Sequence, residues 1–163
     1  MKAIILQEDL LRSLLSASRF ISSRPQLPVL ANILITAEKS RVKVNATNLE
    51  LGISLQVGAK VEKEGSITIP ARMAVELISN LPAGQINLEE KKGSLFLSTQ
   101  SFSATISGIS STEFPPVPDS IDKESFFISN KILADLASKV VFSAAVDDSR
   151  PVLTGLLFTF GEK

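Results

Sequence analysis

Two Ser-Arg-Pro triplets stand in the chain, at Ser23 to Pro25 and at Ser149 to Pro151. The proline ring excludes helical backbone for the residue before it, so Arg24 and Arg150 are each held in extended chain. An apolar run follows each triplet, and the first of these, Val29 to Ala37, is typical of a buried strand. Each copy therefore presents one arginine at the entrance to a rigid strand, a suitable place to hold a phosphate.

The triplets belong to a longer internal repeat. SRPQLPVLANILIT, from Ser23 to Thr36, returns as SRPVLTGLLFT, from Ser149 to Thr159. The separation between the copies far exceeds the period of roughly 20 to 50 residues in solenoids and propellers. The repeated unit is therefore a whole domain.

The side chains that could do catalysis or bind a metal are restricted in type. The chain has no cysteine and no histidine, which excludes disulfides, thiolate or imidazole metal sites and every mechanism built on a Cys or His nucleophile. The segments Ser40 to Lys43 and Ser120 to Lys123 match the spacing of a serine nucleophile and a lysine base. That chemistry needs a rigid helix start and an oxyanion hole, whereas these matches fall on a strand edge and in a linker. We expect no enzyme, no metal and no cofactor.

Charge and hydropathy limit the partners. Lysine and arginine number 17 and so do aspartate and glutamate, so the formal net charge is zero. Nucleic-acid binding would need basic residues sorted onto one surface. Since the sequence contains neither an apolar run of membrane-spanning length nor a signal peptide, we expect a cytoplasmic protein with no membrane partner.

Apolar residues at helical spacing predict a helix from Glu8 to Ile21. Its inner stripe contains Leu10, Leu11, Leu14, Leu15, Ala17 and Ile21. The opposite face carries Arg12, Ser16 and Arg19. This face is either an ordinary solvated surface or a short basic stripe suited to lying beside a phosphate backbone.

A second helix is predicted from Ala71, directly after Pro70, to the breaker segment Leu81 to Gly84. Its inner face holds Ala74, Leu77, Ile78 and Leu81, and Arg72 points outward. Strands are predicted at residues 1–6, 29–37, 41–46, 49–61, 66–69, 86–89, 95–98 and 102–107. The fold class is α+β, with antiparallel sheets and two helices per domain on one face.

The proline-dense segment Phe114 to Ser120 is interpreted as a stiff linker at a domain boundary. We therefore expect one complete domain at residues 1–120 and a truncated second one at 121–163. The second domain starts the pattern again, with a helix from Asn130 to Val141 and about three strands, among them Ser125 to Ser129 and the second triplet strand.

The sequence resembles a known family along its whole length. The residues that carry the resemblance are RPQLPVLANILI at Arg24 to Ile35, NATNLEL at Asn45 to Leu51, TIPAR at Thr68 to Arg72, LPAG at Leu81 to Gly84, EFPPVP at Glu113 to Pro118 and DDSRPVLTGLLF at Asp147 to Phe158. In this order they are similar to the N-terminal part of the bacterial sliding clamp, the beta subunit of DNA polymerase III.

The resemblance implies the DNA-clamp fold, with three similar domains per protomer and two protomers closed head to tail into a ring. Helices would line the hole and sheets would form the outer wall. The implied function is that of a non-catalytic processivity factor in DNA replication, within the polymerase (transferase) complex. Its partners would be double-stranded DNA of any sequence, the replicative polymerase, the clamp loader and a second protomer.

The resemblance also implies functional residues. Arg24 and Arg72 would approach the DNA backbone, and the residues expected to add a diffuse positive field are Arg12, Arg19, Lys131 and Lys139. Each of these two arginines also has an alternative role without DNA. Arg24 could instead form a structural hydrogen bond that closes its loop, and Arg72 could be an ordinary surface residue at a helix end. The acidic residues expected on the outer wall are Glu62, Glu64, Glu89 and Glu90.

Two protein-binding sites are implied in part. Arg150, Val152 and Leu153 would belong to the pocket that receives peptide motifs of clamp users. The ring-closing face would include Leu77, Leu81, Phe102 and Ala104.

The residues alone are also compatible with two other functions. A small-ligand-binding or hydrolase domain would gather ionisable side chains in a pocket. A purely structural assembly module would show no inward bias of lysine and arginine.

Overall fold

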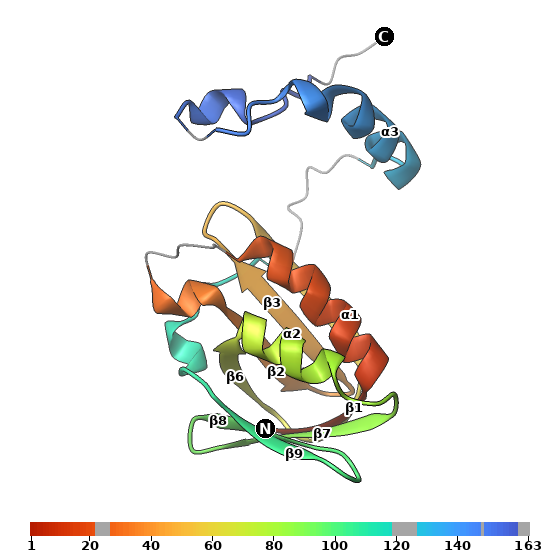
Figure 1. Cartoon of the computed structure of the whole chain (residues 1–163), viewed down its shortest axis with the longest axis vertical. Coiled ribbons are helices and arrows are strands. Elements are labelled where there is room, and N and C mark those ends of the chain that lie inside the picture. The colour runs from red at the N-terminus through yellow and green to blue at the C-terminus, as the bar shows by residue number, and fades with distance from the viewer. Residues whose placement is uncertain (22–26, 119–126, 148, 160–163) are drawn as a thin grey trace. The chain divides into compact units, whose positions relative to one another are not determined.

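The computed structural model describes residues 1–21, 27–118, 127–147 and 149–159. They belong to two compact units, Met1–Ser120 and Ile121–Lys163 (Figure 1). The first triplet, with Arg24, lies outside the described residues.

The first unit contains two antiparallel sheets. One sheet has the strand order β5-β1-β7-β8-β9, with β1 at Lys2–Leu6, β5 at Lys60–Lys63, β7 at Gln85–Lys91, β8 at Ser94–Ser98 and β9 at Ser103–Ser107. The other has the order β4-β3-β2-β6, with β2 at Asn32–Glu38, β3 at Arg41–Thr47, β4 at Gly52–Gly58 and β6 at Gly65–Pro70. The predicted α+β class with antiparallel sheets is confirmed.

The run 49–61, predicted as one strand, is divided between the two sheets. β4 pairs with β3, whereas β5 pairs with β1 in the other sheet. Between them the amide of Ala59 donates to the carbonyl oxygen of Ser40 at 3.0 Å. The alternation of side chains continues through this corner, so periodicity alone could not locate the change of sheet.

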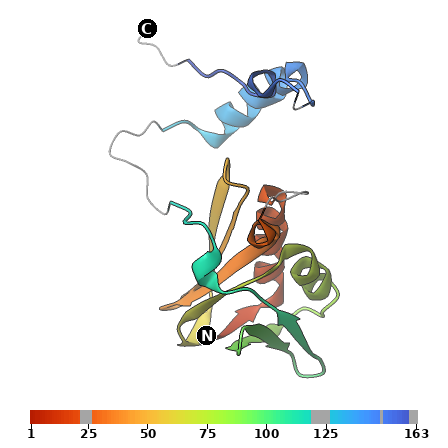
Figure 2. The same ribbon diagram turned by 90° about the vertical axis from the view of Figure 1, so that its left-hand side faces the viewer.

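Two helices, α1 at Gln7–Ala17 and α2 at Ala71–Ser79, lie side by side on one side of the sheets (Figures 1 and 2). Helix α1 continues as a 3₁₀ helix at Ser18–Phe20, so it ends earlier than predicted. Its buried stripe is also narrower than predicted, because Leu15 is 46% exposed while Leu10 and Leu14 are fully buried.

The core lies between the helices and the inner faces of both sheets. Alternate residues of each strand enter it, as Ala3 and Ile5 do in β1 and Val42 and Val44 do in β3. Helix α2 contributes the fully buried Ile78. At roughly 25 cal/mol per Å² of apolar surface removed from water, this burial is the main stabilising term of the unit.

A second, smaller cluster covers the other face of the four-stranded sheet. It consists of Val29, Leu30 and Phe114, with Leu34 and Val117 packed against them. Leu34 follows the core residue Ile33 in β2 and therefore points to the opposite face. The segment Phe114 to Ser120 was predicted as a stiff linker, but its first part packs on the sheet, since Phe114 is only 8% exposed and Val117 lies against the same cluster.

The second unit differs most from the prediction. It has helix α3 at Asn130–Val140 and 3₁₀ helices at Val141–Ser143 and Pro151–Leu153, but no strand among its described residues. The strand expected from Ser125 to Ser129 is therefore wrong for its described residues 127–129, and so is the strand expected after Ser149; Ser125 and Phe126 lie outside the described residues.

The contrast between the two repeat copies has a physical cause. In the first copy a 3₁₀ helix at Pro28–Ala31 leads into β2, which is hydrogen-bonded on both edges by β3 and β6. A strand without neighbours leaves its backbone groups unpaired. The described residues of the second unit offer no such neighbours, so the same sequence pattern does not form a strand.

Candidate nucleic-acid interface

The helices α1 and α2 run antiparallel, and hydrogen bonds fix one end of the pair. The Gln7 side-chain amide donates to the carbonyl oxygen of Ile78 at 2.8 Å, and the Gln7 backbone amide donates to Gly84 O at 2.8 Å. The start of α1 therefore lies beside the end of α2. At the opposite end, Ser18 and Ile21 line a hollow of about 350 Å³ together with Arg72, Val75 and Glu76 from α2.

Three arginines stand on the exposed surface of this pair, namely Arg12, Arg19 and Arg72. Among the described residues none of them takes part in a salt bridge. Guanidinium groups that are exposed and unpaired can donate to phosphate oxygens without reading base sequence.

The helical surface is not purely basic. Glu8 and Asp9 occupy the first turn of α1, and Glu76 is exposed on α2. Acidic residues in a first turn stabilise a helix through its dipole, which accounts for Glu8 and Asp9. The three arginines are therefore balanced by three carboxylates in the described part of this surface.

The sheets likewise carry both positive and negative side chains. Lys2 Nζ lies 2.8 Å from Glu62 Oε2, and Lys91 Nζ lies 2.7 Å from Glu89 Oε2. The hydrogen bond from Lys2 lowers the pKa of Glu62 and raises that of Lys2, and the hydrogen bond from Lys91 lowers the pKa of Glu89. The expected sorting, with cations on the helices and acids on the sheets, was too simple, because lysines on the sheets neutralise these acids.

In the second unit, Lys131 and Lys139 are both exposed on α3. Lys139 Nζ contacts Asp135 Oδ2 at 2.7 Å, one turn away on the same helix. This pair partly cancels the charge of Lys139, so Lys131 is the better of the two candidates for contact with an anion.

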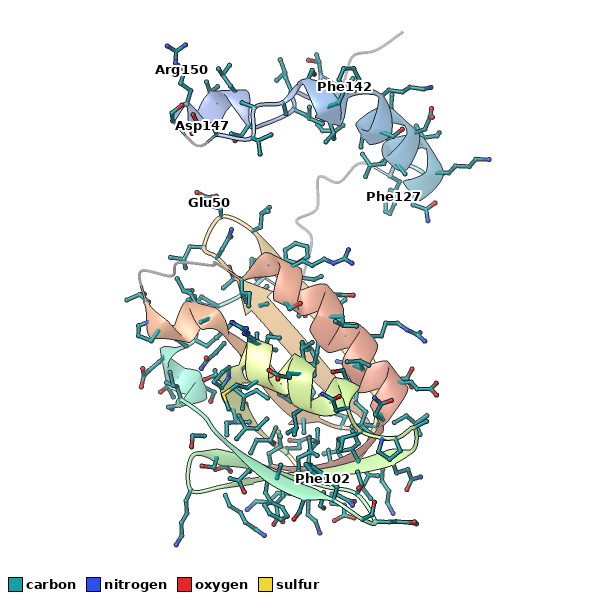
Figure 3. All side chains as sticks on the ribbon, viewed as in Figure 1. Glu50, Phe102, Phe127, Phe142, Asp147 and Arg150 are labelled. Atoms are coloured by element: carbon teal, nitrogen blue, oxygen red, sulfur yellow. The ribbon has the colours of Figure 1, made fainter. Side chains whose placement is uncertain are left out.

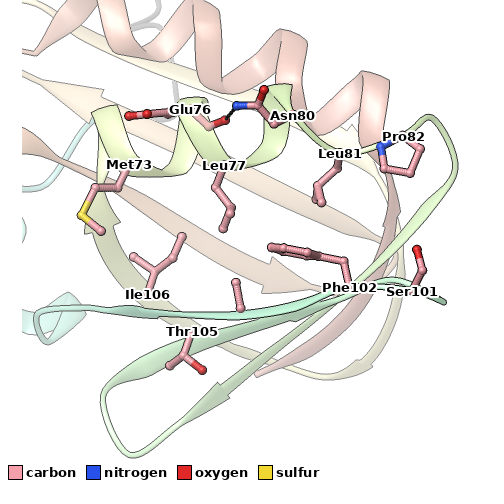
Figure 4. A pocket seen from close by; sticks show the side chains of 11 residues that line it. Met73, Glu76, Leu77, Asn80, Leu81, Pro82, Ser101, Phe102, Thr105 and Ile106 are labelled. Atoms are coloured by element: carbon pink, nitrogen blue, oxygen red, sulfur yellow. Dashed lines mark hydrogen bonds between the residues drawn. The ribbon is translucent and has the colours of Figure 1, made fainter.

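The four residues proposed for a ring-closing face come together. Leu77 from α2, Leu81 from the segment just after α2, and Phe102 and Ala104 from around β9 line one hollow of about 680 Å³ (Figure 4). The Phe102 ring is 39% exposed, and β9 is an edge strand of its sheet.

Sequence reasoning missed three apolar residues of the same hollow, Met73, Pro82 and Ile106. A signal for Met73 was present. Met73, Leu77 and Leu81 follow one another at a spacing of four, which places them along one helix face.

Arg150, Val152 and Leu153 occupy a single exposed turn. The Leu153 amide donates to Arg150 O at 2.9 Å, and Leu153 O accepts from the Ala145 amide at 2.9 Å. Figure 3 shows the side chains of Arg150 and Asp147 at the same end of this unit. Hydrogen bonds from Ser149 lower the pKa of Asp147.

The described residues contain no group of three or more His, Cys, Asp or Glu side chains that could hold a metal ion. None of the helices in the described ranges is long and apolar enough to cross a membrane.

Comparison with known proteins settles the family. Residues 1–118 match the family model of the DNA polymerase III beta subunit, N-terminal domain. The chain belongs to the DNA polymerase III beta subunit family.

The curated relatives of this beta-subunit chain include the beta sliding clamps of Synechococcus elongatus, 35% identical over 159 residues, and of a Synechocystis species, 33% identical over 165 residues. Each alignment covers 96% of the chain but only 42% of the relative. The chain thus spans less than half the length of these relatives.

Solved structures of the beta-subunit family have the same fold. The DNA polymerase III subunit beta of Pseudomonas aeruginosa is 27% identical, with a TM-score of 0.86 over 95% of this chain and 43% of that one. The pol III beta of Caulobacter crescentus is 26% identical, with a TM-score of 0.87 over 95% of this chain and 42% of that one.

Proposed function

We propose that the chain is part of a DNA sliding clamp, a ring that encircles duplex DNA and tethers the replicative polymerase. The observation that carries the proposal is the pairing of family membership with an exposed antiparallel helix pair bearing Arg12, Arg19 and Arg72. Residues 1–120 would be the complete first clamp domain and residues 121–163 the beginning of the second.

The contacts between such a clamp and DNA would go to phosphates and would be independent of sequence. Arg72 and Arg24 would lie nearest the backbone, with Arg12, Arg19, Lys131 and Lys139 adding to the field. Enclosure rather than affinity would keep the protein on DNA. The function needs no catalytic group, and the clamp loader and the polymerase would be its protein partners.

This function is tested by comparing how long the protein stays on circular DNA and on linear DNA. A polypeptide extended along the same reading frame to the length of the curated relatives is loaded onto a nicked circular plasmid by a clamp loader. We expect it to stay on the circle through gel filtration and to leave after a restriction enzyme linearises the plasmid. Equal loss from circular and linear DNA would refute encirclement.

The hollow lined by Leu77, Leu81, Phe102 and Ala104 is proposed as part of the ring-closing face. Its apolar lining and the free edge of β9 suit a partner strand that pairs by backbone hydrogen bonds. In the extended polypeptide, Phe102→Asp should convert dimers to monomers in sedimentation velocity, whereas Phe102→Leu should leave them dimeric. A dimeric Phe102→Asp variant would contradict this assignment.

The exposed turn with Arg150, Val152 and Leu153 is proposed as a fragment of a partner-peptide pocket. Only part of such a pocket is present, so peptides should bind the 163-residue chain weakly and the extended polypeptide more tightly. Isothermal titration of both with one peptide from a clamp user measures the difference, and equal affinity would exclude this role.

A small-ligand-binding or hydrolase domain is not supported. Among the described residues, Arg72 and Glu76 are the only ionisable residues that line the hollow beside Ser18 and Ile21, and Glu76 is the only one that lines the apolar hollow beside β9. Neither gathers the paired acid and base groups that hydrolysis requires.

A further inference from the structure

The charges on the helical surface of the first unit are not scattered at random. Glu8 and Asp9 lie at the end of the pair where Gln7 bonds to Ile78. Arg72 lies at the other end, where it lines the hollow with Ser18, and Arg19 follows Ser18 in the chain. One end is therefore acidic and the other basic.

The two ends are far enough apart to act separately. Ser18 lies ten positions after Glu8, and at about 1.5 Å of rise per residue the two lie ~15 Å apart along the axis. The screening length at physiological ionic strength is about 8 Å. A phosphate held at the Arg72 end is consequently little repelled by Glu8 and Asp9.

The helix dipoles do not reverse this polarity. Because α1 and α2 are antiparallel, the partial charges of their termini oppose each other at both ends of the pair. The charged side chains therefore decide the sign of the electrostatic potential at each end of the pair. Glu76, one turn from Arg72 on α2, is the acidic residue that lines the basic-end hollow, and it limits how closely a second phosphate can approach.

We propose that this helix pair contacts a duplex backbone through one end only, the end with Ser18, Arg19 and Arg72, and that the Glu8–Asp9 end is held away from the phosphates. The inference rests on the proposed function and adds to it an orientation of the duplex across this domain. Arg12, about one turn beyond Glu8, marks the transition between the two ends.

The test is a titration of the ¹⁵N-labelled 163-residue chain with a 12-base-pair duplex, from low salt upward, followed by amide chemical shifts. We expect salt-sensitive shifts at Ser18, Arg19 and Arg72, and none at Glu8, Asp9 or Asn80. Each phosphate contact contributes about 0.9 to the slope of log K against log salt. Replacing Arg19 and Arg72 by alanine should therefore reduce the magnitude of the slope by about 1.8.

Matched variants sharpen the result. Lys63→Ala removes one cation from the exposed sheet side and should change neither the shifts nor the slope. Glu8→Gln with Asp9→Asn should extend the shifts toward the start of α1. Glu76→Gln should strengthen binding at the basic end. It is the substitute test if the double change at Glu8 and Asp9 weakens the helix.

The outcomes separate the two proposals. Equal shifts at both ends, or shifts confined to the Glu8–Asp9 end, would overturn the one-ended contact while leaving DNA contact by the helices in place. Shifts confined to the sheets, or none up to millimolar duplex, would overturn DNA contact by these helices altogether, and the retention experiment on circular and linear plasmid would still decide encirclement by itself.

Discussion

The side-chain amide of Gln7 donates a 2.8 Å hydrogen bond to the carbonyl oxygen of Ile78, 71 residues further along the chain. Gln7 is only 5% exposed, and its contact joins the first residue of α1 to the last turn of α2. The bond thereby sets the antiparallel arrangement that places Glu8 and Asp9 at one end of the helical surface and Arg72 at the other.

Loss of this bond should destabilise the first unit. Gln7→Ala removes a buried donor and some packing, and we expect a loss of about 1–2 kcal/mol in the free energy of unfolding, measured in urea. Gln100→Ala, at an exposed position, is the control and should change stability by less than about 0.5 kcal/mol. Equal effects of the two changes would show that the bond has no special role.

Thr68 links the four-stranded sheet to the segment after β9. Its hydroxyl donates to Ile109 O at 2.8 Å and accepts from Asn32 Nδ2 at 3.2 Å, and Thr68 is fully buried. Thr68→Val keeps the shape but leaves the buried Asn32 Nδ2 without this acceptor, while Ile109 O keeps only the bond from the Thr68 backbone amide at 3.3 Å. We therefore expect a loss of about 1–3 kcal/mol by chemical denaturation. The same change at the exposed Thr105 should be nearly neutral.

Gly108 sits where no side chain fits. A Cβ atom there would lie 2.5 Å from the carbonyl oxygen of Thr68 and 2.8 Å from the Ile67 side chain. Gly108→Ala should therefore lower stability by about 1–3 kcal/mol. At Gly58 a Cβ would meet nothing within 4 Å, so Gly58→Ala should leave the thermal midpoint nearly unchanged. Similar midpoints for both variants would rule out the steric explanation.

Glu38 makes stability depend on pH. Lys43 and Arg41 donate to its carboxylate at 3.3 Å and 3.1 Å, and the hydrogen bond from Lys43, with that from Arg41, lowers the pKa of Glu38. A lowered pKa means that the unfolded chain takes up the proton first. The stabilisation is therefore complete above the ordinary value of 4.5 and is lost as the pH falls through the lower folded-state value.

Glu38→Gln should reduce the urea midpoint at pH 7 and have little effect at pH 3. Glu113→Gln provides the control, since Glu113 forms no salt bridge within the described ranges. A midpoint difference between wild type and Glu38→Gln that is the same at both pH values would contradict the linkage.

Local patterns predicted much of the first unit. The alternation in Arg41–Thr47 and the apolar spacing of Leu10, Leu14 and Ala17 located a strand and a helix, because the pleat and the helical turn impose their periods directly on the sequence. The same periods could not show that Leu15 is exposed or that Phe114 packs on a sheet. Those outcomes depend on what lies opposite each side chain.

The second repeat copy also shows that a local sequence pattern is not sufficient to predict structure. SRPVLTGLLFT has the composition of a strand, yet residues 151–153 form a 3₁₀ helix and the described residues after them no regular element. Strand formation depends on neighbours that supply hydrogen bonds, and these come from distant parts of a chain.

For the candidate site, the sequence alone determined which residues carry charge, which helix faces are apolar and which family motifs occur, since each of these is a property of residue type and spacing. Only the tertiary structure decided that Leu77 and Phe102 share one hollow and that Arg72 lies at the opposite end of the helix pair from Glu8. Such pairings join residues far apart in the chain, and long-range contacts between packed elements determine them.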